Sequence, residues 1–221
     1  MKSLVIFDCD GVLVETEALA NQCEVNALAR LGVNIPLEEY MDISLGKHNR
    51  QVTGILKEKF GINLSADFWQ EVALEQKKIF EQELRPVEGI VQVIESMSFP
   101  KCIASGSSPS RLHLTLKITG LHSHFEGYIF SAEHVARGKP FPDIFLYAAD
   151  QMQANPQNCI VIEDSLAGIE GALAAGMTVL AFGGGQHITS RMRQNLKESK
   201  AHVYFERMSE LNEILDEVKR G

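Results

Sequence analysis

Short runs of apolar residues, each followed by polar or turn-forming residues, recur along the chain and predict buried strands. They cover residues 3–7, 101–104, 159–162 and 177–181. Apolar runs of four or five residues between turn signals are typical of strands that are buried on both faces of a parallel sheet.

Amphipathic stretches with helical spacing lie between the later strands. They cover residues 90–97, a segment that opens at Ser108-Pro109, a segment that opens at Phe141-Pro142, and residues 165–175 before Gly176. Serine before proline is typical of a helix start, and glycine commonly follows the last helical residue. Strands that alternate with helices predict a doubly wound α/β domain, with a parallel sheet covered on both faces.

The section from about residue 15 to residue 85 shows a different pattern. Its apolar residues have helical spacing over residues 17–31, 49–60 and 66–84, and it has no convincing strand. The apolar stripe that includes Trp69 is interpreted as core rather than as a ligand site. We therefore predict an all-helical cap at 15–85, inserted after the first strand of a core formed by 1–14 and 86–221. The connections near 14–15 and 84–87 would be its hinges.

Composition narrows the class of partner. The chain has 221 residues, a net charge of −8 and a sequence pI near 5.4, which disfavours nucleic acid and anionic membranes. Its apolar runs are shorter than the roughly 18 residues of a membrane span, and its start does not resemble a signal segment. We expect a cytoplasmic protein, with a monomer as the default because the sequence has no sustained heptad pattern.

The cysteine pattern favours buried, reduced thiols. The four cysteines are Cys9, Cys23, Cys102 and Cys159, and they contain no C-x-x-C pair. Three of the four lie in apolar runs. Zinc and disulfide sites are the less favoured alternatives.

Polar residues follow three of the predicted strands. Asp8 and Asp10 follow the first, Ser105 the second, and Glu163 with Asp164 the third. The two-residue spacing predicts that the Asp8 and Asp10 side chains lie on the same side, where a cation would offset their repulsion. Ligands of open α/β sheets bind beyond the carboxyl ends of the strands, so these residues predict a metal-binding reaction site if the strands are neighbours.

Each of these residues also has a simpler interpretation on its own. Ser105 could begin a turn, Lys139 could be a solvated loop charge, and Asp164-Ser165 could be a helix cap. Their joint occurrence in this order is what favours a reaction site.

The ordered set Asp8-x-Asp10-Gly11, Ser105, Lys139-Pro140 and Glu163-Asp164 resembles the phosphatase branch of the haloacid dehalogenase superfamily. The residues FDCDGVLVETE at 7–17 and VIEDSLAGIEGALAAGM at 161–177 are its specific motifs, and the resemblance spans essentially the whole chain. The position of the predicted cap matches the subgroup with a helical cap. The superfamily's dehalogenases lack the second aspartate of the first motif, so Asp10 disfavours carbon–halogen cleavage.

This resemblance implies a Mg²⁺-dependent phosphatase that acts on small phosphomonoesters. Asp8 would be the nucleophile and Asp10 the general acid and base. Lys139 would offset phosphate charge and orient Asp8. The metal ligands would be Asp8, Asp164 and the Asp10 main-chain carbonyl, with Glu163 acting directly or through water.

The resemblance also suggests where substrate binds. Ser105 and the amides of Gly106 and Ser107 precede a predicted helix and would bind phosphate. In the cap, Gly46, Lys47 and Arg50 belong to one of few basic clusters and would contact the substrate, the alternative being a solvated helix start.

Within the superfamily the chain most resembles the group around β-phosphoglucomutase and 6-phosphogluconate phosphatase. Ala20 stands where the mutases have histidine, and Ser108 where they have lysine, which favours hydrolysis over phosphosugar transfer. Val12 and Glu15 replace the usual threonine and aspartate without loss of a ligand that the reaction needs.

Three functions remain as alternatives: a sugar-phosphate phosphatase, which is favoured, a β-phosphoglucomutase-like mutase, and a non-catalytic domain on the same fold. The last predicts loss of Asp8, Asp10, Lys139 or Asp164, and all four are present. The sequence leaves the physiological substrate and the isomer of the Lys139–Pro140 bond open.

Overall fold

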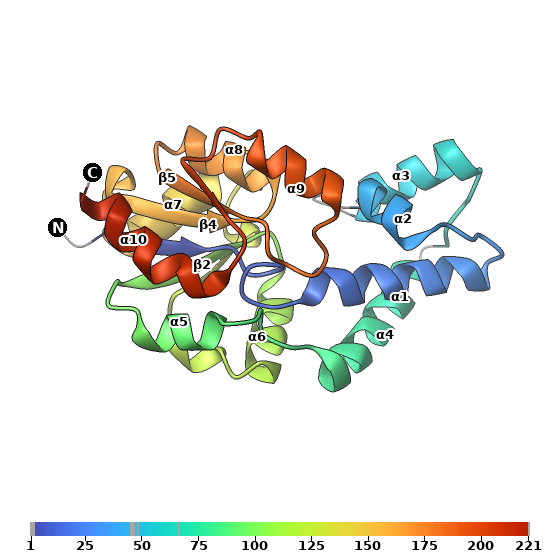
Figure 1. The fold of residues 1–221 in the computed structure, drawn as a ribbon. Coiled ribbons are helices and arrows are strands. Elements are labelled where there is room, and N and C mark those ends of the chain that lie inside the picture. Colours follow the sequence, from blue (N-terminus) through green and yellow to red (C-terminus); the bar gives the residue numbers. More distant parts are fainter. Residues whose placement is uncertain (1–2, 45–46, 48, 66, 221) are drawn as a thin grey trace. The chain divides into compact units, whose positions relative to one another are not determined.

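A computed structural model describes residues 3–44, 47, 49–65 and 67–220. The chain divides into two compact units, one formed by Met1–Glu15 with Arg85–Gly221 and the other by Thr16–Leu84. The expected boundaries, at residues 14–15 and 85–86, lie one residue from these bounds. Figure 1 shows the helices and strands of both units.

The first unit is built on a six-stranded parallel sheet with strand order β3-β2-β1-β4-β5-β6. The strands are β1 Leu4–Phe7, β2 Lys101–Ser105, β3 Ile129–Ser131, β4 Cys159–Glu163, β5 Thr178–Phe182 and β6 Val203–Phe205. The predicted doubly wound α/β fold is confirmed. Because β1 lies between β2 and β4, the three strands that precede the candidate site residues are neighbours.

Helices cover both faces of this sheet, as Figure 1 shows for α5 and α6 on one side and α7 and α8 on the other. The helices of this unit are α5 Ile90–Ser96, α6 Pro109–Ile118, α7 Asp143–Gln151, α8 Leu166–Ala174, α9 Ser190–Lys197 and α10 Leu211–Arg220. Single 3₁₀ turns occur at His122–His124, Ala132–His134, Pro156–Asn158 and Met208–Glu210. Leu4 and Ile6 of β1 belong to one buried cluster with Phe145 of α7 and Ile169 of α8. Burial on both faces explains the continuous apolar runs of the strands.

The sequence did not reveal four elements of this unit: the edge strands β3 and β6, and the helices α9 and α10. Each edge strand has only three residues, which is too short for a periodic pattern. In α9 only Leu196 is buried, and most of its residues are polar, so the helix offers too few apolar positions to be recognised.

The second unit contains helices only among its described residues: α1 Thr16–Arg30, α2 Leu37–Ser44, α3 Asn49–Phe60 and α4 Phe68–Glu83. Its core joins apolar residues of all four helices, including Leu28, Tyr40, Leu56 and Val72. Trp69 packs against this core, and its indole Nε1 donates to Thr53 Oγ1 at 2.9 Å. The predicted all-helical insertion is therefore present, with α2 as a helix that the sequence pattern did not reveal.

The two connections between the units pair with each other through their backbones. Val14 and Pro86 form an antiparallel bridge, and the Glu15 amide donates to the Arg85 carbonyl at 3.1 Å. The Val87 amide likewise donates to the Leu13 carbonyl at 3.0 Å. The predicted hinges therefore leave the first unit side by side.

All four cysteines lie among the described residues, and all are buried and free of disulfides, as the sequence predicted. Burial raises the pKa of Cys159 to about 11, so its thiol is protonated at neutral pH. Within the described ranges, no helix has the length and apolar character that crossing a membrane requires.

Candidate active site

Lys139 joins two of the candidate carboxylates at the carboxyl end of the sheet. Its ammonium donates to Asp8 Oδ1 at 2.6 Å and also to Glu163 Oε1. Burial by itself lowers the pKa of Lys139, but the carboxylates of Asp8 and Glu163 outweigh burial and raise it. Lys139 is therefore a permanent cation beside Asp8. The Lys139–Pro140 bond, which the sequence left open, is cis.

Glu163 is the most deeply buried member of the site, with a fully buried side chain at the end of β4. Its Oε2 accepts hydrogen bonds from the amides of Asp164 and Ser165 at 3.0 and 2.9 Å and from the Ser165 hydroxyl at 2.9 Å. Oε1 accepts from Lys139. Because both oxygens are engaged by the protein, Glu163 orients Lys139 and the Asp164 backbone.

Gly168, in the first turn of α8, makes room for this carboxylate. A Cβ at this position would lie 1.7 Å from Glu163 Oε1. We expect Gly168→Ala to lower the free energy of unfolding by about 3 kcal/mol, because the buried carboxylate must move away from Lys139. Urea denaturation measures this change.

Gly54 offers a matched control, because it is a helical glycine in α3 with open space around its Cβ position. Gly54→Ala should raise the free energy of unfolding by roughly 0.8 kcal/mol, from the helix propensity of alanine. Equal effects of the two substitutions would contradict a special packing role for Gly168.

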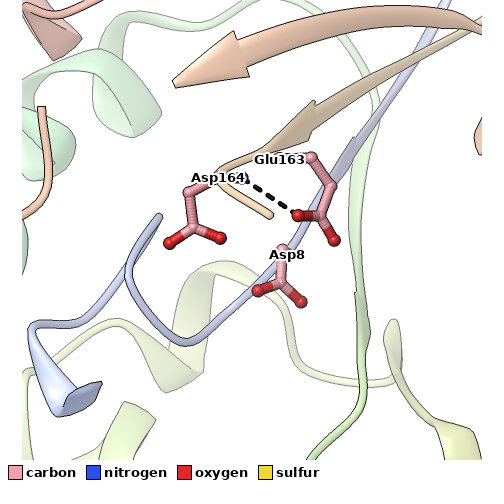
Figure 2. A group of neighbouring side chains, drawn as sticks. All are labelled: Asp8, Glu163 and Asp164. Carbon is pink, nitrogen blue, oxygen red and sulfur yellow. Dashed lines mark hydrogen bonds between the residues drawn. The ribbon is translucent and has the colours of Figure 1, made fainter. Parts of the chain in front are cut away.

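Three buried carboxylates come together at this edge of the sheet: Asp8, Glu163 and Asp164 each offer an oxygen, and these oxygens lie within 4.8 Å of one another (Figure 2). Burial raises the pKa of Asp8 well above its ordinary value, Lys139 opposes the rise, and the other carboxylates add to it. Burial likewise raises the pKa of Asp164, against a hydrogen bond from His187. One lysine does not balance three buried carboxylates, so the site is suited to a hard divalent cation.

Asp164 is contacted from the loop that follows β5. His187 Nε2 lies 3.0 Å from Asp164 Oδ2, and the His187 side chain is buried. Gly11 has a φ of +82°, and a Cβ there would lie 2.0 Å from Asp164 Oδ2. The glycine after Asp10 is thus required both by its backbone conformation and by the close approach of Asp164.

The Asp10 carboxylate has different partners from the Asp8 carboxylate. β1 ends at Phe7, so Asp10 lies in the following turn rather than on the strand. Asp10 Oδ2 accepts from Ser107 Oγ at 2.6 Å, and Oδ1 lies 3.5 Å from Arg111 Nη2. The alternation rule placed both aspartates at the same sheet edge, but the turn directs Asp10 towards the start of α6.

The segment expected to bind phosphate is at the end of β2. Ser105 is buried, and its Oγ accepts from the Ser107 amide at 3.1 Å. The Ser107 amide is therefore directed at Ser105 in this structure, whereas Gly106 is exposed. Ser108 caps α6, as predicted, by accepting from the Arg111 amide. Ser105, Gly106 and Ser107 thus follow one another at the end of β2, as expected. The Ser107 side chain, however, donates to Asp10.

The expected cap residues belong to the second unit. Lys47 and Arg50 are exposed, with Arg50 in the first turn of α3. Gly46 lies outside the described residues.

The sequence reasoning missed Arg111 and His187. Arg111 is in the first turn of the helix that Ser108 caps, so the predicted helix start could have indicated it. His187 follows the three glycines after β5, the strand next to β4. Asp8 and Asp164 were identified because ligands of such sheets bind beyond the carboxyl ends of the strands. The same reasoning, applied to the residues after β5, would have indicated His187.

Residues 2–176 match the model of the haloacid dehalogenase-like hydrolase family. The 6-phosphogluconate phosphatase of Escherichia coli (strain K12) is 30% identical over 180 residues, which are 80% of this chain and 81% of that protein. The phosphorylated carbohydrates phosphatase of Thermotoga maritima is 30% identical over 177 residues, 78% of this chain and 81% of that protein. A solved haloacid dehalogenase-like protein of unknown function from Agrobacterium tumefaciens matches with a TM-score of 0.90 and 33% identity, over 99% of this chain and 100% of that chain.

Proposed function

Because the chain belongs to the haloacid dehalogenase-like hydrolase family, we propose that it hydrolyses small phosphorylated metabolites, in particular sugar phosphates, through a phosphoryl group carried on Asp8. Membership of this family together with phosphatase-named relatives supports a phosphoric monoester hydrolase. We propose that the enzyme acts as a monomer, because the sequence has no sustained heptad pattern, and in the cytoplasm, because its apolar runs are shorter than a membrane span.

The observation that carries the proposal is the contact between Lys139 and Asp8. A carboxylate nucleophile and a phosphate dianion repel each other, so the reaction needs positive charge at the point of attack. Lys139 supplies such a charge 2.6 Å from Asp8 Oδ1. Its second contact, with Glu163, limits its movement, so it also fixes the orientation of the nucleophile.

We assign proton transfer to Asp10 because it is the second aspartate of the first motif, two residues after the proposed nucleophile. Ser107 and Arg111 contact its two oxygens and define its position beside the nucleophile. In the first step, Asp8 Oδ attacks phosphorus, the bond from phosphorus to the sugar oxygen breaks, and Asp10 donates a proton to that oxygen. In the second step, Asp10 accepts a proton from the attacking water, and the bond between Asp8 and phosphorus breaks to release phosphate.

The residues present fit Mg²⁺, because the site provides carboxylate oxygens that its own lysine does not balance. Asp8 and Asp164 would hold the ion with their carboxylates, and Asp10 with its main-chain carbonyl. Glu163 would act through its hydrogen bonds, since both of its oxygens already have protein partners. When bound, the ion would offset negative charge on the phosphoryl oxygens.

Hydrolysis is favoured over phosphosugar transfer by two residues. Ala20 is a buried residue of α1 without a polar group, and Ser108 uses its side chain to cap α6. Neither offers the histidine or lysine that the resemblance to the mutases leads one to expect at these positions.

We propose that Lys47 and Arg50 select sugar phosphates by binding their hydroxyl or oxyanion groups. Lys47→Ala or Arg50→Ala should lower kcat/KM for a sugar phosphate by roughly tenfold more than for p-nitrophenyl phosphate, because a lost charge-assisted hydrogen bond costs about 1.5 kcal/mol. Lys57→Ala, another exposed cation of α3, serves as the control. Equal losses on both substrates would exclude this role.

The function is tested by phosphate release from a panel of sugar phosphates, with Mg²⁺ and with a chelator. We expect release that depends on Mg²⁺ and that disappears in Asp8→Asn. Conversion of one sugar phosphate into its positional isomer without release of phosphate would instead identify a mutase. No reaction with any compound, with Mg²⁺ bound, would favour the non-catalytic alternative.

A further inference from the structure

His187 lies in the loop between β5 and α9, and the proposed reaction assigns no role to it. Its Nε2 lies 3.0 Å from Asp164 Oδ2, and only 3% of the residue is exposed. Because a carboxylate oxygen only accepts hydrogen bonds, Nε2 is the donor. The contact joins the loop after β5 to the residue that follows β4.

The backbone packs closely around the His187 imidazole and so holds it against Asp164. A Cβ on Gly11 would lie 2.5 Å from His187 Cε1, and a Cβ on Gly185 would lie 2.8 Å from the same atom. Two glycines therefore enclose the imidazole, and no larger residue fits at either position without displacing it. The preceding residue is also anchored, because the Gln186 amide donates to Glu15 Oε2 at 3.0 Å.

These contacts restrict the Asp164 carboxylate. A hydrogen bond to Oδ2 limits rotation about the bond between Cβ and Cγ, so Asp164 keeps an oxygen within 4.8 Å of those of Asp8 and Glu163 (Figure 2). Partners that orient a metal ligand in this way commonly change metal affinity by about 10–100-fold.

We infer that His187 is a positioning residue that holds the Asp164 carboxylate in the orientation needed to bind a divalent cation. This inference rests on the proposed function, because that function makes Asp164 a metal ligand. In this role His187 acts through Asp164 and is not itself a ligand of the ion or of the substrate.

The test is calorimetric titration of the metal-free protein with Mg²⁺ alone. It compares the wild type with two variants in which an amide side chain replaces the imidazole of His187. In His187→Gln the amide nitrogen reaches the position of Nε2, whereas in His187→Asn it reaches only that of Nδ1. We expect His187→Asn to raise the Kd for Mg²⁺ by about 10–100-fold, and His187→Gln to stay within about threefold of the wild type. A Kd that is unchanged in His187→Asn, or raised equally in both variants, would overturn the inference.

Two further variants separate positioning from general stability. Thr189→Ala removes the cap of α9 in the same loop without touching Asp164, so it should lower the melting temperature and leave the Kd unchanged. Gly185→Ala keeps His187 but crowds its ring, so it should weaken Mg²⁺ binding. Circular dichroism shows whether His187→Asn folds. If it does not fold, the Gly185→Ala variant provides the test, and a Kd for Mg²⁺ equal to that of the wild type would overturn the inference.

Failure of the inference is distinguishable from failure of the proposed function. A wild-type protein that releases no phosphate overturns the function, while the Mg²⁺ titrations still decide the role of His187. A wild-type protein that releases phosphate, but whose Mg²⁺ affinity does not depend on His187, overturns the inference alone. A wild-type protein that does not bind Mg²⁺ overturns both.

Discussion

Asp8→Asn should reduce phosphate release on the order of 10⁴-fold or more, because the reaction loses its nucleophile. An amide has nearly the same shape as a carboxylate, so we expect the variant to fold and its Oδ1 to keep accepting from Lys139. Phosphate release at saturating substrate, together with circular dichroism, measures both expectations.

Asp10→Asn is the matched control, because it makes the same chemical change two residues away. It removes the proposed acid and base and keeps the nucleophile, so hydrolysis of the intermediate should become slow. Acid quenching with radiolabelled substrate should therefore detect phosphoryl-protein in Asp10→Asn and none in Asp8→Asn. Phosphoryl-protein in Asp8→Asn, or near-normal turnover, would exclude Asp8 as the nucleophile.

Lys139→Met should lower both activity and stability. It removes the charge that faces the phosphoryl group, for which we expect a loss of roughly 10³-fold in kcat. It also leaves the fully buried Glu163 carboxylate without its cation. Loss of one partner from a buried ion pair costs about 3 kcal/mol, equivalent to a melting temperature lower by roughly 9 °C. Phosphate release and thermal melting with a chelator present measure these changes.

Arg137→Ala is the control for this prediction, because it removes a cation two residues away in the same loop. Arg137 pairs with Asp143 at the surface, with 56% of its side chain exposed, so little change in melting temperature is expected. A Lys139→Met variant that is as stable as Arg137→Ala would show that Glu163 does not need the ammonium.

Local pattern in the sequence determined the fold of the first unit. The strands β1, β2, β4 and β5 are buried on both faces, so each forms a continuous apolar run in the sequence. Such a run can be recognised without knowing which strand lies next to it. The same pattern placed polar residues at the carboxyl ends of adjacent strands, which is why Asp8, Ser105 and Asp164 were found. The edge strands β3 and β6 were not predicted, because three residues are too few to show a repeating pattern of apolar and polar positions.

Only the tertiary structure decided which partner each of these side chains has. Lys139 meets Asp8 across 131 positions of sequence, and Asp10 meets Ser107 across 97. The turn after β1, rather than strand alternation, separates the directions of Asp8 and Asp10. Periodicity reports only the face on which a residue lies, whereas an ion pair or a hydrogen bond depends on distances of a few ångströms between segments. For this physical reason the sequence identified the chemical groups of the site, whereas the packing of α6 and of the loop after β5 at the sheet edge added Arg111 and His187.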